Sequence, residues 1–323
     1  MACSVITGDV FASHDLPSHA ECGERLRSAL SGVPEGLKVL PPVRATIEDL
    51  ERVHHPQHVR LLRELSRGVR FIDPSTYVTP ASFDVALYAA GSAIRALERA
   101  LDGERCFAMV RPPGHHAEPD RAMGFCLFNN VGVAVARVLA QKTVDRVAII
   151  DWDLHHGNGT QKIFYRDDRV LFCSIHECGA FPRTGWIDEV GSGSGKGYTL
   201  NAPLRAGAGI DDYALIFEDI FFPAIERFAP DIIVVSAGQD SLSDDLRGNM
   251  DLKPEDYGVL TSIVKEITGG PLALVLEGGY GPSHGDAIRH IFESLRNRSY
   301  EYTCENARPS SHRLAGTLKK LLL

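Results

Sequence analysis

Short apolar runs alternate along the chain with longer segments in which apolar residues recur every three or four positions. The runs contain almost no polar residues, as is typical of strands that are buried on both faces of a parallel sheet. We therefore expect strands at Cys106–Val110, Val147–Ile150, Val170–Ile175, Ile232–Val235 and Leu272–Leu276.

The longer segments between the runs have the ends expected of helices. We predict helices at Ser82–Leu101, Asn130–Gln141, Asp211–Phe228, Pro254–Ile267 and Asp286–Arg296. The first stops before Gly103, the third begins with an aspartate suited to an N-cap, and the fourth has proline in its first turn with Gly269 after its end. This alternation predicts an α/β fold with a central parallel sheet and helices on both faces. Without a repeat or linker, residues 1–323 are expected to form a single domain.

Charge and cysteine content narrow the classes of function. The net charge is −8, which disfavours direct nucleic-acid binding but leaves a cationic substrate open. The seven cysteines are an odd number and include no Cys-x-x-Cys, which fits a reducing cytoplasm. No apolar run approaches the roughly 20 residues of a membrane helix, and no signal peptide is visible, so we expect a soluble cytoplasmic protein.

The chemically unusual residues follow directly after the predicted strands. Such segments lie at Arg111–His116, Asp151–Gly159, Ser236–Asp240 and Glu277–Tyr280. Because parallel strands point the same way, their carboxyl ends share one edge of the sheet, where α/β folds bind ligands. We expect these four segments to form one site.

A metal site is predicted within these segments. On an extended backbone, Asp153 and His155 face the same side, and Asp240 can supply a third ligand from a neighbouring strand. Two carboxylates and an imidazole suit Zn²⁺ and leave a coordination position open, as in catalytic sites. Fe²⁺ is compatible with the same ligands.

Two adjacent histidines and a tyrosine complete the candidate chemistry. His115 and His116 follow a stiff Pro-Pro-Gly turn and suit proton transfer near neutral pH. Asp151 and Asn158 flank the metal segment and are available to orient the two rings. Tyr280 follows two glycines and can donate a hydrogen bond to a developing oxyanion.

Two other segments have a composition typical of a binding site, but their context argues against one. Gly191–Gly197 resembles a phosphate loop, but Lys196 is followed by glycine and a strand-like stretch, Tyr198–Asn201, comes where a helix is required. We interpret it as a surface loop. Cys173–Cys178 lies in a strand-like context that favours buried packing over metal ligation.

Together these motifs resemble the histone deacetylase family, in particular its class II and prokaryotic branch with the acetylpolyamine amidohydrolases. The resemblance rests on Arg111–Ala117, Gly124–Asn130, Asp151–Gln161, Ser236–Asp240 and Leu276–Tyr280, with weaker matches at His19–Leu26, Phe181–Gly185 and Gly197–Pro203. It covers a core of about residues 5–297 and leaves 298–323 as a C-terminal extension.

The resemblance implies an arginase/deacetylase-like fold and a zinc-dependent deacetylase that acts on an acetylated lysine or a similar amine. It implies one Zn²⁺ on Asp153, His155 and Asp240, and His115 and His116 as the catalytic pair, supported by Asp151 and Asn158 respectively, with His116 as the general base. It also implies that Tyr280 contacts the acetyl carbonyl and that Gly124, Phe125 and Phe181 wall a narrow tunnel. Structural K⁺ is implied at two sites, the first comprising Asp151, Asp153, His155, Ser174 and Ile175, and the second comprising Phe164, Asp167, Val170 and Tyr198.

The chain departs from the family pattern at two positions. Leu246-Arg247 stands where relatives often have Pro-Leu, which places Arg247 near the expected tunnel mouth, where it would repel polyamines and favour acidic flanks. Ala20 replaces a common proline, which affects only the local loop.

Several alternatives stay open. A binuclear ureohydrolase would need further bridging carboxylates, but Ser241 and Leu242 follow Asp240. A silent acetyl-lysine binder would be expected to have lost a ligand or Tyr280. The natural acyl group, the acceptor (protein lysine, polyamine or metabolite), the oligomeric state and the role of the extension are not specified by the sequence.

Overall fold

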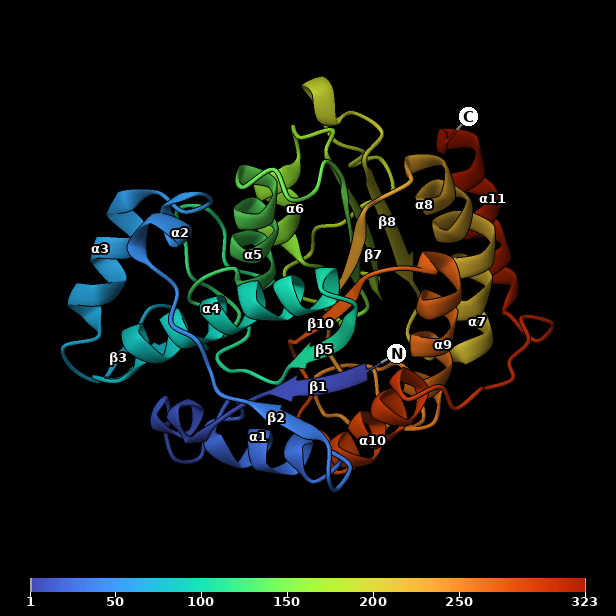
Figure 1. Ribbon diagram of the computed structural model, residues 1–323. Coiled ribbons are helices and arrows are strands. Elements are labelled where there is room, and N and C mark those ends of the chain that lie inside the picture. Colours follow the sequence, from blue (N-terminus) through green and yellow to red (C-terminus); the bar gives the residue numbers. More distant parts are fainter. Residues whose placement is uncertain (1, 323) are drawn as a thin grey trace.

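A computed structural model describes residues 2–322 of the chain. At its centre is an eight-stranded sheet in which every neighbouring pair is parallel, in the order β2-β1-β5-β10-β9-β6-β7-β8 (Figure 1). The strands are β1 Ala2–Ile6, β2 Lys38–Leu40, β5 Glu104–Ala108, β6 Val147–Asp151, β7 Val170–Glu177, β8 Thr199–Leu204, β9 Ile232–Ala237 and β10 Leu272–Leu276. A separate antiparallel pair joins β3 Arg70–Phe71 to β4 Tyr77–Val78.

All five predicted strands are present, which confirms the interpretation of the buried runs. Their bounds differ in places: β5 begins and ends two residues earlier than Cys106–Val110, and β7 continues to Glu177. The sequence did not predict β1 or β2, and it indicated only the first part of β8. β2 is an edge strand of three residues with Val39 58% exposed, so it lacks the apolar signature of a buried strand.

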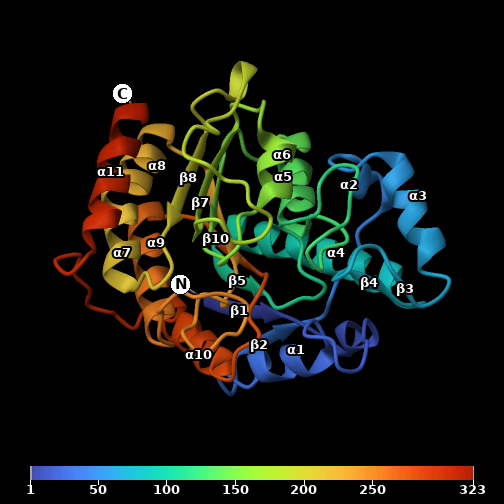
Figure 2. The same ribbon diagram turned by 180° about the vertical axis from the view of Figure 1, so that it is seen from behind.

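Helices cover both faces of the sheet, as predicted (Figures 1 and 2). One face carries α4, α5 and α6, and the other carries α7 to α11 (Figures 1 and 2). The helices are α1 Gly23–Leu30, α2 Ile47–Glu51, α3 Pro56–Leu65, α4 Ser82–Leu101, α5 Asn130–Ala140, α6 Asn158–Phe164, α7 Ile210–Ile216, α8 Phe222–Phe228, α9 Asp256–Thr268, α10 His284–Leu295 and α11 Pro309–Leu322. Short 3₁₀ turns lie at η1 Asp9–Ser13 and η2 Gly193–Gly195.

The helix predicted at Asp211–Phe228 is not continuous. It divides into α7, a π-helical turn η3 at Phe217–Phe221, and α8. Pro223 lies in the first turn of α8 and has no N–H to donate to a carbonyl one turn earlier, so the backbone widens before it. The other four helices match to within two residues at each end, and Gly269 ends α9 with φ 53°, as its position predicted.

The extension after residue 297 includes a helix that packs on the domain. Helix α11 lies against α7 and β8, with Ala315 and Leu318 buried. It therefore covers part of the sheet edge at β8. Among residues 2–322, no helix is both long and apolar enough to span a bilayer.

Candidate active site

The four predicted polar segments meet at one edge of the sheet. They follow β5, β6, β9 and β10, which are neighbours in the order β5-β10-β9-β6. This confirms the prediction that strands far apart in sequence bring these segments together.

Asp153, His155 and Asp240 form the only group of potential metal ligands with three or more members in the part of the chain that the structure describes. One ligand atom from each residue lies within 4.8 Å of the other two. Nδ1 of His155 is 2.9 Å from Oδ2 of Asp240 and 3.3 Å from Oδ1 of Asp153. Backbone N–H groups fix both carboxylates, from Leu154 to Asp240 at 2.9 Å and from Gly278 to Asp153 at 2.8 Å.

The electrostatics of this triad call for a cation. Burial, and then the nearby charge of Asp153, raise the pKa of Asp240 above its ordinary value. Two carboxylates this deeply buried repel each other unless a positive charge lies between them. The donor set and its geometry therefore fit a divalent metal ion with an open coordination position.

Two glycines, neither predicted as a site residue, make room for the triad. A Cβ on Gly238 would lie 2.0 Å from Oδ2 of Asp153, and one on Gly278 would lie 2.4 Å from Oδ2 of Asp240. Both positions need a residue without a side chain. Their only sequence signal is that each glycine lies in a segment that follows a buried strand.

His115 and His116 lie side by side, with ring centroids 4.0 Å apart. Nδ1 of His115 is 3.1 Å from Oδ2 of Asp151, and Nδ1 of His116 is 2.8 Å from Oδ1 of Asn158. Burial alone would lower the pKa of His115, but the charges of Asp153 and Asp151 hold it well above the ordinary range. Burial and the charge of His115 lower the pKa of His116 well below that range.

Two glutamates that were not predicted as site residues support the histidine segment. Glu277 is buried and accepts backbone hydrogen bonds from Gly114 at 2.6 Å and from His115 at 3.1 Å. Glu118 accepts a hydrogen bond from Nδ2 of Asn158 at 2.9 Å. Glutamate is too common for either to stand out in sequence, and their contacts depend on the tertiary fold.

Aromatic rings and Arg247 surround the opening above the triad. The cavity measures about 280 Å³. The Phe125 and Tyr280 ring centroids are 5.6 Å apart, and Phe181 meets the ring of His116 edge-on at 5.0 Å. The guanidinium of Arg247 lies 5.6 Å from the Phe125 ring and 5.7 Å from the Tyr280 ring. The residues lining the cavity are Ser75, Pro113, His115, His116, Gly124, Phe125, Asp153, His155, Phe181, Asp240, Arg247, Gly278 and Tyr280.

The residues implied for potassium lie in two further groups. In the first, Asp151 of β6 pairs in register with Ser174 of β7, Ile175 follows, and the Ser174 hydroxyl is 2.9 Å from Nδ1 of His176. In the second, the carbonyls of Phe164, Asp167 and Tyr198 accept backbone hydrogen bonds from Asp167, Val170 and Phe172. The Asp167 carboxylate also pairs with Arg169. Most of the oxygen atoms that could bind a cation in this second group therefore already accept a hydrogen bond or form an ion pair.

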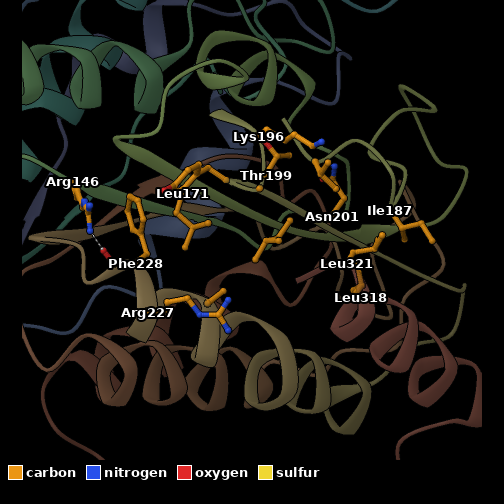
Figure 3. A pocket seen from close by; sticks show the side chains of 15 residues that line it. Arg146, Leu171, Ile187, Lys196, Thr199, Asn201, Arg227, Phe228, Leu318 and Leu321 are labelled. Carbon is orange, nitrogen blue, oxygen red and sulfur yellow. Dashed lines mark hydrogen bonds between the residues drawn. The ribbon is translucent and has the colours of Figure 1, made fainter. Parts of the chain in front are cut away.

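A larger cavity of about 610 Å³ lies away from this chemistry, between β8, α8 and α11. Figure 3 shows Leu318 and Leu321 beside Ile187 at one end and Arg146 beside Phe228 at the other. Arg146 donates a hydrogen bond to the Phe228 carbonyl at 3.0 Å. Apart from Tyr198, this cavity contains none of the predicted site residues.

Comparison with known proteins gives a consistent result. Residues 19–295 match the family model of the histone deacetylase domain. A probable deacetylase of Archaeoglobus fulgidus is 40% identical over 294 residues, which are 85% of this chain and 82% of that protein. A histone deacetylase-like amidohydrolase of Pseudomonas aeruginosa is 40% identical over 280 residues, covering 82% and 73% of the two chains. The crystal structure of the HDA15 HD domain superimposes with a TM-score of 0.93 at 31% identity, covering 100% of this chain and 95% of that one.

Proposed function

Because the chain belongs to the histone deacetylase family, we propose that it is a zinc-dependent amidohydrolase that removes acetyl or similar short acyl groups from a lysine-like amine. The products would be acetate and the free amine. The observation that carries the proposal is the Asp153–His155–Asp240 triad beside a histidine pair at the floor of an aromatic-walled cavity.

We propose that Asp153, His155 and Asp240 hold Zn²⁺, or Fe²⁺ where that ion is more available. Such an ion supplies a water of lowered pKa and polarises the acyl carbonyl. The chain contributes the backbone N–H groups that fix the two carboxylates and the glycines that leave room for them.

The two histidines would share the proton transfers. His116 points Nδ1 at the amide oxygen of Asn158, so its Nε2 lone pair is free to accept the proton of the attacking water. The water oxygen bonds to the acyl carbon and the carbon–nitrogen bond breaks. The departing amine takes a proton from a histidine, and His115, held beside Asp151, is placed to remain cationic meanwhile.

Tyr280 would donate a hydrogen bond to the carbonyl oxygen as it gains negative charge. Gly124, Phe125 and Phe181 would grip the aliphatic stem of the substrate. The edge-on packing of Phe181 against His116 and of Phe125 against Tyr280 ties these walls to the reacting groups.

Arg247 lies at the cavity beside Phe125 and Tyr280, and we propose that it selects among acceptors. A guanidinium there repels polyamines and attracts an acidic residue next to the acyl-lysine. The alternative substrate is an acetylated polyamine or metabolite. Acetate release from a peptide and from a polyamine, measured side by side, distinguishes a protein substrate from a polyamine.

We further propose structural K⁺ at the group formed by Asp151, Asp153, His155, Ser174 and Ile175, and at the group formed by Phe164, Asp167, Val170 and Tyr198. The first group combines buried carboxylates with the adjoining strand, which supports it more strongly than the second. The cytoplasm remains the proposed compartment, since all seven cysteines are unpaired.

The deciding experiment measures acetate released from an acetyl-lysine peptide and from an acetylated polyamine, with and without a chelator, followed by zinc add-back. Turnover that the chelator abolishes and zinc restores is expected. Zinc binding without turnover of either substrate would instead indicate another acyl group or a silent binder. Urea release from guanidino substrates would indicate a ureohydrolase.

A further inference from the structure

We infer that Glu118 is a positioning residue that sets the orientation of the Asn158 amide and, through it, the tautomer of His116. The inference rests on the proposed function, since it assigns His116 the role of base.

The two histidines of the pair have different kinds of partner. His115 faces the carboxylate of Asp151, whose two oxygens are equivalent acceptors. His116 faces the amide of Asn158, which offers an acceptor at one end and a donor at the other. Only one orientation of that amide leaves Nδ1 of His116 as the donor and Nε2 as the free base.

The surroundings of Asn158 specify that orientation. Its Nδ2 lies near three acceptors, Oε1 of Glu118 at 2.9 Å, the backbone oxygen of His116 at 3.4 Å and the Met123 sulfur at 3.5 Å. A reversed amide would place its oxygen against the Glu118 carboxylate and its N–H₂ against the ring of His116. The carboxylate is the strongest of the three acceptors, because hydrogen bonds to charged groups are stronger than neutral ones.

The Glu118 carboxylate has a second partner. Its second oxygen, Oε2, is 2.7 Å from Nζ of Lys162, and its side chain is only 20% exposed. Lys162 belongs to α6, the helix that begins at Asn158, so one short helix carries both residues that contact the Glu118 carboxylate. The ion pair with Lys162 is half-exposed and is expected to add little by itself.

The test compares Glu118→Ala with Glu118→Gln, which keeps an oxygen for the Asn158 amide. We expect Glu118→Ala to lower kcat on the acetyl-lysine peptide by about tenfold or more with little change in KM, since general-base catalysis is at stake. Glu118→Gln is expected to retain most of kcat. Lys162→Met is the matched control, because it removes the ion pair, leaves the carboxylate in place and should leave kcat within about twofold.

A second arm changes Asn158→Asp, which makes the partner of His116 symmetric. In that background Glu118→Ala should cost nothing in kcat, because no amide remains to be oriented. An equal loss in both backgrounds would mean that Glu118 acts only on local packing, and the inference would be wrong. The same conclusion would follow if Glu118→Gln were as damaged as Glu118→Ala.

Imidazole ¹⁵N NMR of the zinc-loaded protein separates this inference from the proposed function. The His116 signal is identified by its absence in His116→Asn. We expect it to show a proton on Nδ1 in the wild type and in Glu118→Gln. In Glu118→Ala we expect that tautomer to be lost. This holds even if the protein turns over neither substrate, in which case only the proposed function fails. An unchanged tautomer in Glu118→Ala would overturn the inference.

Discussion

At the scale of single residues, the site depends on what each functional group faces. His115 and His116 are adjacent in sequence, yet one faces a carboxylate and the other an amide. The opposite directions of their pKa shifts follow from this difference together with the carboxylates around His115. The environment of each ring, and not the residue type, separates the two pKa values.

Tyr280 supports a first prediction. Tyr280→Phe removes only the phenol that would stabilise the oxyanion, so kcat on the acetyl-lysine peptide should fall by roughly 10²-fold. Zinc content, measured by metal analysis, should not change, because Tyr280 is not a ligand of the triad. Tyr165→Phe, outside the cavity, is the control. Full activity in Tyr280→Phe would remove the tyrosine from the proposed mechanism.

Gly278 supports a second prediction. In Gly278→Ala the new Cβ would meet Oδ2 of Asp240 at 2.4 Å and Oδ2 of Asp153 at 2.7 Å, so both carboxylates must move. We expect zinc affinity, measured by chelator competition, to fall by about 10- to 100-fold.

Gly316→Ala is the control, because nothing lies within 4 Å of the Cβ that it would add and the residue is in the interior of α11. That change should leave zinc affinity alone and stabilise the fold by about 0.5–1 kcal/mol. Equal zinc affinity in both variants would show that the triad tolerates a side chain at position 278.

At the scale of elements, a buried ion cluster attaches the N-terminal segment to the loop after β5. Glu21 pairs with Arg111 at 2.7 Å and with Arg25 at 3.0 Å, and all three side chains are almost fully buried. Arg25 also donates a hydrogen bond to the Gly279 carbonyl at 2.9 Å, which links the cluster to the segment that carries Tyr280. The cluster therefore connects three parts of the chain beneath the site.

Replacing Glu21 tests this connection. Glu21→Gln leaves two buried arginines without a counter-charge and should lower the free energy of unfolding at pH 7 by about 3 kcal/mol. Burial raises the pKa of Glu21, but Arg111 and Arg25 outweigh it and hold the pKa below its ordinary 4.5. The carboxylate therefore stabilises the fold above about pH 4.5, and this contribution is lost as the pH falls toward the folded pKa.

Urea denaturation at several pH values measures this effect. The gap between wild type and Glu21→Gln should be widest near neutral pH and should narrow below about pH 4.5. Glu24, which lies in helix α1 three residues after Glu21 and has a side chain that is 69% exposed, supplies the control, since Glu24→Gln should change the free energy of unfolding by less than about 1 kcal/mol. A gap that stays constant with pH would mean that the loss is one of packing and not of charge.

The sequence predicted elements well where burial is uniform and poorly where it is not. The central strands are apolar on both faces, so their runs were visible and their bounds nearly right. The N-terminal helices α1 to α3 are short and mix charged with apolar residues, and η3 depends on how Pro223 is accommodated, which no periodicity records. Contacts within the site are equally hard to predict from local sequence. Glu277 accepts a hydrogen bond from Gly114, which is 163 positions away, and a glutamate is too common for its presence to indicate such a contact.

At the scale of the whole molecule, sheet order produces the site. The segments that follow β5, β10, β9 and β6 come from positions 111 to 280, and only their order in the sheet makes them neighbours. The sequence identified these segments because histidine and aspartate directly after buried strands are unusual. The net charge of −8 favours the approach of cationic substrates, whereas a guanidinium such as that of Arg247, which lines the cavity, would repel them.

Substitution of Arg247 tests whether the local charge at the cavity outweighs the net charge of the molecule in the choice of substrate. Its guanidinium lies within 6 Å of the Phe125 and Tyr280 rings, so it is close to any side chain flanking the acyl-lysine. An exposed charge pair at such distances contributes about 1 kcal/mol, or roughly a fivefold preference. We expect the wild type to favour an acetyl-lysine peptide with acidic flanks over one with basic flanks by that factor in kcat/KM, and to turn over an acetylated polyamine poorly.

Arg247→Leu should abolish the preference, Arg247→Glu should reverse it, and added salt should weaken the preference that remains. Arg60→Leu, which replaces an exposed arginine of helix α3 outside the cavity, should leave the ranking unchanged. If Arg247→Leu ranks the substrates as the wild type does, selection lies in the tunnel walls and the acidic-flank hypothesis is wrong.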